Sequence, residues 1–186
     1  MIFIVYFAVA TLIPVDGSVT EFKIPSFAAI SMAFAAGIGE ELCFRGLFLG
    51  TLMRQWKDDH KKVIFAVLLS SVVFGALHLT NISSGAVVFV SVMQSLSAAF
   101  IGVAFAAVYI RSGNLLVPMF FHVLTDIMAF ATNTKVSEDG VVTGTYQLGD
   151  AIDDVLCLIL MIIGLWMLRS GVFEEIREVW DRKWRL

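Results

Sequence analysis

Long apolar stretches, separated by short polar segments, organise this chain of 186 residues. Five of them run roughly Ser26–Met53, Val63–Leu79, Ala86–Ile110, Leu115–Ala131 and Ile152–Leu168. Each is about long enough to cross a hydrocarbon core some ~30 Å thick. Continuously apolar stretches favour helices over the alternating strands of a barrel, because helices pair their own backbone polar groups in lipid. The pattern therefore predicts an all-α fold, a polytopic transmembrane helical bundle.

The two ends of the chain extend this pattern. Met1–Ile13 is apolar but short, and we expect it to be part of a sixth hydrophobic, transmembrane segment, with a signal-peptide core as the alternative. The tail has apolar residues at helical spacing and predicts an amphipathic helix on the inner membrane face, with tryptophan at headgroup level. A solvated charged tail is the alternative. We divide the chain into a partial segment and outer loop (1–25), one membrane domain (26–169) and a cytoplasmic tail (170–186).

Basic residues are segregated between alternate connecting segments. Segments 54–62 and 111–114, with the tail after residue 168, hold ten lysines and arginines, whereas the other connecting segments hold only Lys23 and Lys135. Cytoplasmic loops carry the excess of lysine and arginine in membrane proteins. The distribution predicts a multi-pass protein of the cell membrane with both termini in the cytoplasm.

Composition narrows the class of protein further. The chain is 59% hydrophobic and 16% charged, with a mean hydropathy of +0.87, whereas a soluble domain is about a quarter charged. No basic patch indicates a nucleic-acid partner. Cys43 and Cys157 both lie in apolar stretches, so neither a disulfide framework nor a structural zinc site of the thiolate type is expected.

Ionisable residues inside the predicted spans are costly and usually functional. They are Glu40, Glu41, Arg45, His78, His122 and Asp126. Asp153 and Asp154 fall at a span boundary, where we expect them to be hydrated. Glu41 and Arg45 are four residues apart, which favours an ion pair on one helix face. Such a pair offsets the desolvation of both groups and leaves Glu40 available for chemistry.

The histidines lie on two further spans. His78 follows Phe74 by four residues near the end of one span, and His122 precedes Asp126 by four on another. With Glu40, these residues would supply a general base for water and groups that stabilise an oxyanion. Two imidazoles and a carboxylate could also hold one divalent metal such as zinc, although the H-E-x-x-H signature is absent.

Simpler explanations exist for each group. Any of these polar residues could serve only to hold helices together by hydrogen bonds. A mechanism that pairs the Cys43 thiol with a histidine is the least favoured, because the sequence gives no reason for thiolate formation there.

Three motifs in order resemble the CAAX protease and bacteriocin-processing (CPBP) family of intramembrane peptidases, over roughly Ser26 to Phe130. They are Glu40-Glu41-x-x-x-Arg45, Phe74-x-x-x-His78 and His122-x-x-x-Asp126. The resemblance implies that Glu40 activates water with help from His78, and that His122 and residue 126 bind the oxyanion or a metal. It also implies that Arg45 fixes Glu41. The third motif often ends in asparagine in this family, and Asp126 makes the site more negative.

The residues and the resemblance together predict an intramembrane endopeptidase, a hydrolase of the CAAX type and a candidate metalloprotease. Its partners would be the lipid bilayer and a membrane-associated protein or peptide substrate, and neither a CAAX peptide nor a bacteriocin leader is specified by the residues. One alternative is a non-catalytic bacteriocin immunity or membrane scaffold protein. Another is a proton-coupled transporter, which would usually show internal repeats or interrupted helices.

Overall fold

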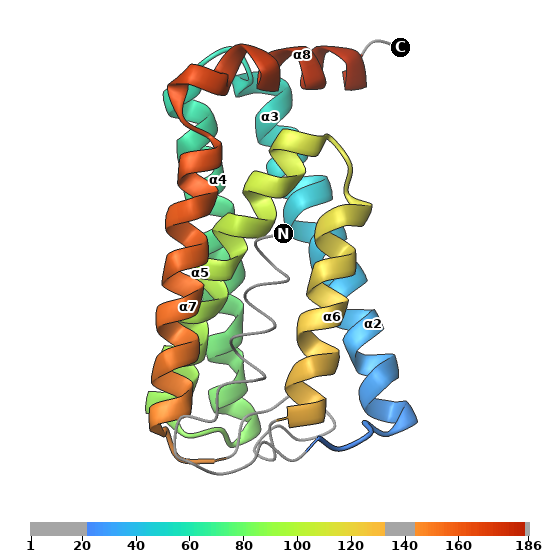
Figure 1. Ribbon diagram of the computed structural model, residues 1–186, viewed down its shortest axis with the longest axis vertical. Coiled ribbons are helices and arrows are strands. Elements are labelled where there is room, and N and C mark those ends of the chain that lie inside the picture. Colours follow the sequence, from blue (N-terminus) through green and yellow to red (C-terminus); the bar gives the residue numbers. More distant parts are fainter. Residues whose placement is uncertain (1–21, 133–143, 185–186) are drawn as a thin grey trace.

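The computed structural model describes residues 22–132 and 144–184, and this part of the chain contains helices and no strand (Figure 1). The elements are α2 (Phe27–Glu41), η1 (Leu42–Leu49, a π-helix), α3 (Gly50–Trp56), α4 (His60–Leu77), η2 (His78–Ser84, a 3₁₀ helix), α5 (Val88–Ser112), α6 (Leu116–Thr132), α7 (Leu148–Met167), η3 (Ser170–Val172) and α8 (Phe173–Trp184). The predicted segment Met1–Ile13 lies outside the described residues.

Three helical stretches are long and apolar enough to cross a membrane. They are Phe27–Trp56, His60–Ser84 and Val88–Ser112. A fourth candidate joins α7 to the segment Ser170–Trp184 across a bend of 53°. The apolar helix α6 is shorter, at 17 residues. The all-α membrane bundle is thus confirmed, whereas the predicted number of six segments is not.

Local sequence signals set where several helices begin and end. The hydroxyl of Ser26 accepts a hydrogen bond from the Ala29 amide at the start of α2, and the Asp59 carboxylate accepts two at the start of α4. Such caps satisfy amide groups that the first helical turn leaves free. Gly113 ends α5 with a φ of 66°, a conformation that glycine adopts without strain.

The helices pack in two groups that meet around α5. One group is α4, α5 and α7, and the other is the pair α2 and α6 (Figure 1). Glycine allows close approach in both. A Cβ atom added to Gly37 of α2 would lie 2.6 Å from Cγ2 of Val123 on α6, and one added to Gly164 of α7 would lie 3.1 Å from Cα of Ala104 on α5. Small residues at such interfaces are how helices pack tightly in membranes.

Helix α8 lies across one end of the bundle (Figure 1). Its residues Ile176 and Trp180 are buried, and the Trp180 indole N–H donates to the Ile110 carbonyl at 2.9 Å. The amphipathic helix was expected to place its tryptophans at headgroup level. Trp180 packs on the protein, because the bundle end offers an apolar surface and the Ile110 carbonyl of the last turn of α5. The depth of this helix relative to the headgroups stays a prediction.

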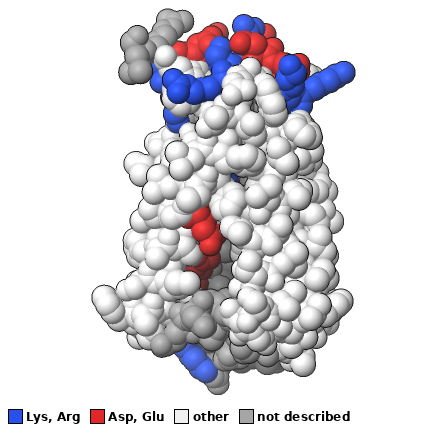
Figure 2. All heavy atoms as spheres, turned by 180° about the vertical axis from the view of Figure 1, so that it is seen from behind, with Lys and Arg blue, Asp and Glu red and all other residues white. Residues whose placement is uncertain are grey.

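Charged side chains gather at this end of the molecule (Figure 2). Ion pairs join α8 to two of the predicted cytoplasmic segments, Lys57 with Asp181 at 2.6 Å and Arg111 with Glu175 at 2.9 Å. The basic segments 54–62 and 111–114 and the tail therefore lie at the same end of the bundle. That this end faces the cytoplasm stays a prediction.

Candidate active site

The first motif lies where α2 gives way to the wide turns of η1. Glu41 and Arg45 are both fully buried, and Nη1 of Arg45 lies 2.8 Å from Oε1 of Glu41, which confirms the predicted ion pair. Nη2 of Arg45 donates to the Gly102 carbonyl on α5 at 3.1 Å, and the guanidinium lies 4.3 Å from the centre of the Phe74 ring. Pairing, hydrogen bonding and a cation–π contact together offset the desolvation of this buried charge.

His122 is held by the same carboxylate. Its Nδ1 lies 2.9 Å from Oε1 of Glu41, and an ionised carboxylate can only accept, so Nδ1 carries the proton. The ring also stacks on Phe105, with centroids 5.3 Å apart. Glu41 therefore orients His122 and binds Arg45 at once. The sequence had linked Glu41 to Arg45 alone, because contact with His122 depends on how α2 packs against α6.

The other nitrogen of His122 faces two carboxylates. Nε2 lies 3.7 Å from Oε2 of Glu40 and 3.8 Å from Oδ2 of Asp126. Both distances exceed those of direct hydrogen bonds, and polar groups at such separations are commonly bridged by water. The structure thus brings Glu40, His122 and Asp126 together around a space that a water molecule or a substrate oxygen could occupy.

His78 approaches from α4 and η2. Its Nδ1 lies 3.3 Å from the Phe74 carbonyl oxygen, so Nδ1 is the donor and Nε2 is left unprotonated in the neutral ring. The Phe74 ring makes edge contacts with both histidines, at centroid distances of 5.3 Å to His78 and 5.8 Å to His122. Phe74 therefore supports both rings, and His78 bonds to it rather than to Glu40 or Asp126.

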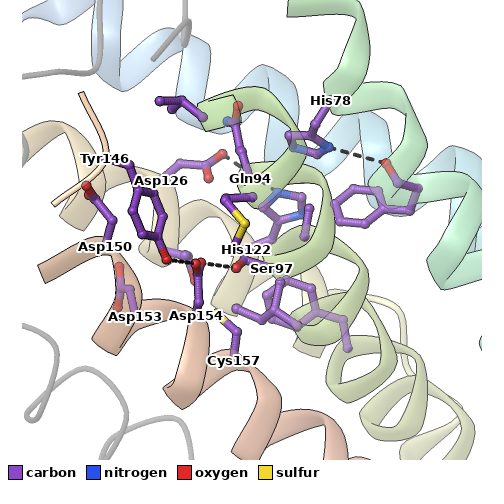
Figure 3. A pocket seen from close by; sticks show the side chains of 17 residues that line it. His78, Gln94, Ser97, His122, Asp126, Tyr146, Asp150, Asp153, Asp154 and Cys157 are labelled. Atoms are coloured by element: carbon purple, nitrogen blue, oxygen red, sulfur yellow. Dashed lines mark hydrogen bonds and ion pairs between the residues drawn. The ribbon is translucent and has the colours of Figure 1, made fainter. Parts of the chain in front are cut away.

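A cavity of about 230 Å³ is lined by residues of α4, η2, α5, α6 and α7, and Glu40 is not among its lining residues. His78, His122 and Asp126 line it, as does a second polar group that the sequence reading did not assign to the site (Figure 3). This group is Gln94, Ser97, Tyr146, Asp150, Asp153 and Asp154. Figure 2 shows acidic side chains inside a narrow cleft between uncharged residues.

Asp153 and Asp154, which the sequence predicts to be hydrated at a span boundary, lie in the first two turns of α7, and Asp153 is exposed. Both line the cavity, and Asp154 accepts hydrogen bonds from the hydroxyls of Ser97 and Tyr146. Desolvation and the bond to Asp154 raise the pKa of Tyr146 to about 12. Helix α7 begins at residue 148, so Asp150 also falls within it. The spacing of the three aspartates, which places them on one helix face, was the signal for this wall.

The predicted metal ligands do not form a ligand set in this arrangement. Among residues 22–132 and 144–184, no three histidine, cysteine, aspartate or glutamate side chains are placed to hold one ion. Metal binding therefore stays a prediction, and no chemical step below passes through a metal. Of the two cysteines, Cys43 is exposed and Cys157 is buried and lines the cavity.

No curated protein and no solved structure matches the chain. The family model described as type II CAAX prenyl endopeptidase Rce1-like matches residues 23–128, which contain all six ionisable residues predicted within the spans. Since the match covers more than half of the sequence, the chain belongs to the type II CAAX prenyl endopeptidase Rce1-like family.

Proposed function

We propose that this protein is an intramembrane endopeptidase that hydrolyses a peptide bond of a membrane-associated protein or peptide with water activated by Glu40. Its family supports a membrane hydrolase of the CAAX endopeptidase class. The observation that carries the residue assignment is the placement of His122, whose Nδ1 is held by Glu41 while its Nε2 faces Glu40 and Asp126.

Glu40 is the general base in this proposal. Its Oε2 lies 3.7 Å from Nε2 of His122, which leaves room for a water molecule in contact with both. As the water oxygen attacks the peptide carbonyl carbon, its proton passes to the Glu40 carboxylate. The unprotonated Nε2 of His78 provides a second acceptor on the opposite wall. Glu40 is free for this role because the buried Arg45 is bound by Glu41.

His122 acts on the carbonyl side. When Nε2 carries a proton, it is a donor directed into the space between the carboxylates, where it stabilises the oxyanion of the tetrahedral intermediate. Return of the proton from Glu40 to the peptide nitrogen breaks the carbon–nitrogen bond and releases the amine. Asp126, which stands 3.8 Å from Nε2, fixes the ring on its other side and orients the substrate.

The test is cleavage of a quenched fluorescent CAAX peptide, in prenylated and unprenylated forms, by the full chain in liposomes. Glu40→Gln keeps the shape of the side chain and removes the base, so we expect kcat to fall by a factor of about 10²–10⁴. Glu174→Gln is the matched control, because Glu174 is 78% exposed on α8 and far along the chain from the motifs. Equal kcat in wild type and Glu40→Gln would refute the assignment of Glu40.

A further inference from the structure

The Arg45 guanidinium lies directly against α5 at Gly102, where a side chain would crowd it. A Cβ atom built on Gly102 would lie 3.0 Å from Nη2 of Arg45, 3.2 Å from Cδ1 of Phe74 and 3.4 Å from Cβ of Ser71. The first two separations are tighter than ordinary contacts of a Cβ atom. The backbone of Gly102 also contributes directly, because its carbonyl accepts from Nη2 at 3.1 Å.

Arg45 has little freedom to move away. It is fully buried, it holds Glu41 at 2.8 Å, and its guanidinium lies 4.3 Å and 5.8 Å from the ring centres of Phe74 and Phe105. A displacement of the guanidinium would therefore be transmitted to the Glu41 carboxylate. The same oxygen of Glu41 holds Nδ1 of His122, so the displacement would reach the ring that faces the cavity.

The contact also links the two helix groups. Glu41 and His122 belong to the pair α2 and α6, whereas Gly102 belongs to α5, which packs on α4, the helix that His78 follows directly. The Arg45–Gly102 hydrogen bond thus ties the carboxylate side of the cavity to the side that carries His78.

We propose that Gly102 is a positioning residue for His122, and that it acts through Arg45 and Glu41. This inference rests on the proposed function for its catalytic consequence, but the position of the ring can be measured without any cleavage assay. Gly102→Ala is the natural probe. Alanine favours a helix interior more than glycine does, so folding should tolerate the change while the chain of contacts shifts by a few tenths of an ångström.

The control is Gly164→Ala. A Cβ atom at Gly164 would meet the backbone of Ala104 at 3.1 Å, which crowds the α5–α7 interface without contacting Arg45. We expect this variant to lose stability and to keep the activity of each folded molecule. Gly102→Ala should keep the stability of the fold and lower kcat by about three- to tenfold, with KM unchanged. A 1 Å displacement of a catalytic group can cost about a hundredfold in rate, and the displacement expected here is smaller.

The direct readout is NMR of protein labelled with ¹⁵N-histidine. The chain has three histidines, and His122→Gln assigns the resonance of the Nδ1 proton held by Glu41. We expect Gly102→Ala to shift this resonance and to leave that of His60 in place, and Gly164→Ala to shift neither of them. An unchanged His122 resonance in Gly102→Ala would overturn the inference.

A double variant tests whether the effect passes through Arg45. Arg45→Lys removes Nη2, the atom nearest to the added Cβ. In that background, Gly102→Ala should change kcat by less than about twofold, because coupled residues are not additive. An equal loss in both backgrounds would overturn the proposed route. Absence of cleavage by wild type, with the His122 shift intact, would count against the proposed function while supporting the positioning role.

Discussion

Replacing Arg45 by methionine tests how much the buried Glu41 carboxylate depends on its ion pair for the stability of the fold. The change keeps a long apolar side chain and removes the 2.8 Å contact with Glu41, the 3.1 Å bond to Gly102 and the cation–π contact with Phe74. Glu41 then stays fully buried and keeps its hydrogen bond to His122, and its Oε2 already has no hydrogen-bond partner among the described residues.

Removing one partner of a buried ion pair typically costs about 3–5 kcal/mol. Since about 1.4 kcal/mol is a tenfold change in an equilibrium constant, the ratio of folded to unfolded protein should fall at least about a hundredfold. The double variant Glu41→Leu/Arg45→Met removes both charges. It should recover most of that loss, because an apolar pair of similar volume avoids the desolvation of two ions. Its peptidase activity should not recover, since His122 has lost its partner at Nδ1.

Reversible unfolding in mixed detergent micelles, followed by tryptophan fluorescence, measures both variants against wild type. A single variant that loses less than about 1 kcal/mol would show that the ion pair contributes little beyond its own desolvation. A double variant as unstable as the single one would also refute the reasoning, because the loss would then come from packing and not from an uncompensated charge.

Three further outcomes follow. Trp180→Ala should cost about 3–5 kcal/mol and expose α8 to trypsin, whereas Trp166→Ala, at a position 61% exposed, should change neither. Tyr146 binds its proton more tightly in the folded state, so the stability it contributes should be present below pH ~10 and lost as the pH rises to about 12. Tyr146→Phe should remove this loss and reduce the late tyrosinate absorbance step by the share of one tyrosine. Elemental analysis of purified protein should find no stoichiometric metal if the side chains keep the observed arrangement, and stoichiometric zinc that His122→Gln removes would show that they rearrange around an ion.

Short-range sequence patterns were sufficient to predict the helices and the contact between Glu41 and Arg45 in the first motif. The apolar stretches predicted the membrane helices, and the spacing of Glu41 and Arg45 predicted their ion pair, because both depend on residues within a few turns of one another. The contact between Glu41 and His122 spans 81 residues of sequence. It depends on how closely Gly37 lets α2 approach α6, which periodicity alone does not specify.

The aspartates at the start of α7 show a second limit of prediction from sequence. Hydropathy placed the start of the last span at Ile152, with Asp153 and Asp154 at its boundary. The helix begins earlier, at Leu148, with a capping box between Gln147 and Asp150. The two carboxylates that were predicted to lie in water therefore line a cavity together with Asp150. The apolar face of α8 was also read as a lipid contact, although packing on the bundle satisfies it equally well.

The Glu41–Arg45 pair has a consequence for how the protein is made. Both members belong to one continuous helical stretch, Phe27–Trp56, whereas their other partners, Gly102 and His122, are synthesised later. Each unpaired charge at the centre of an inserting helix costs about 2.5–3.5 kcal/mol. A pair four residues apart is complete as soon as its own helix forms, so these two charges can enter the bilayer already matched. When α6 is made later, His122 binds a Glu41 carboxylate whose charge is already paired with Arg45.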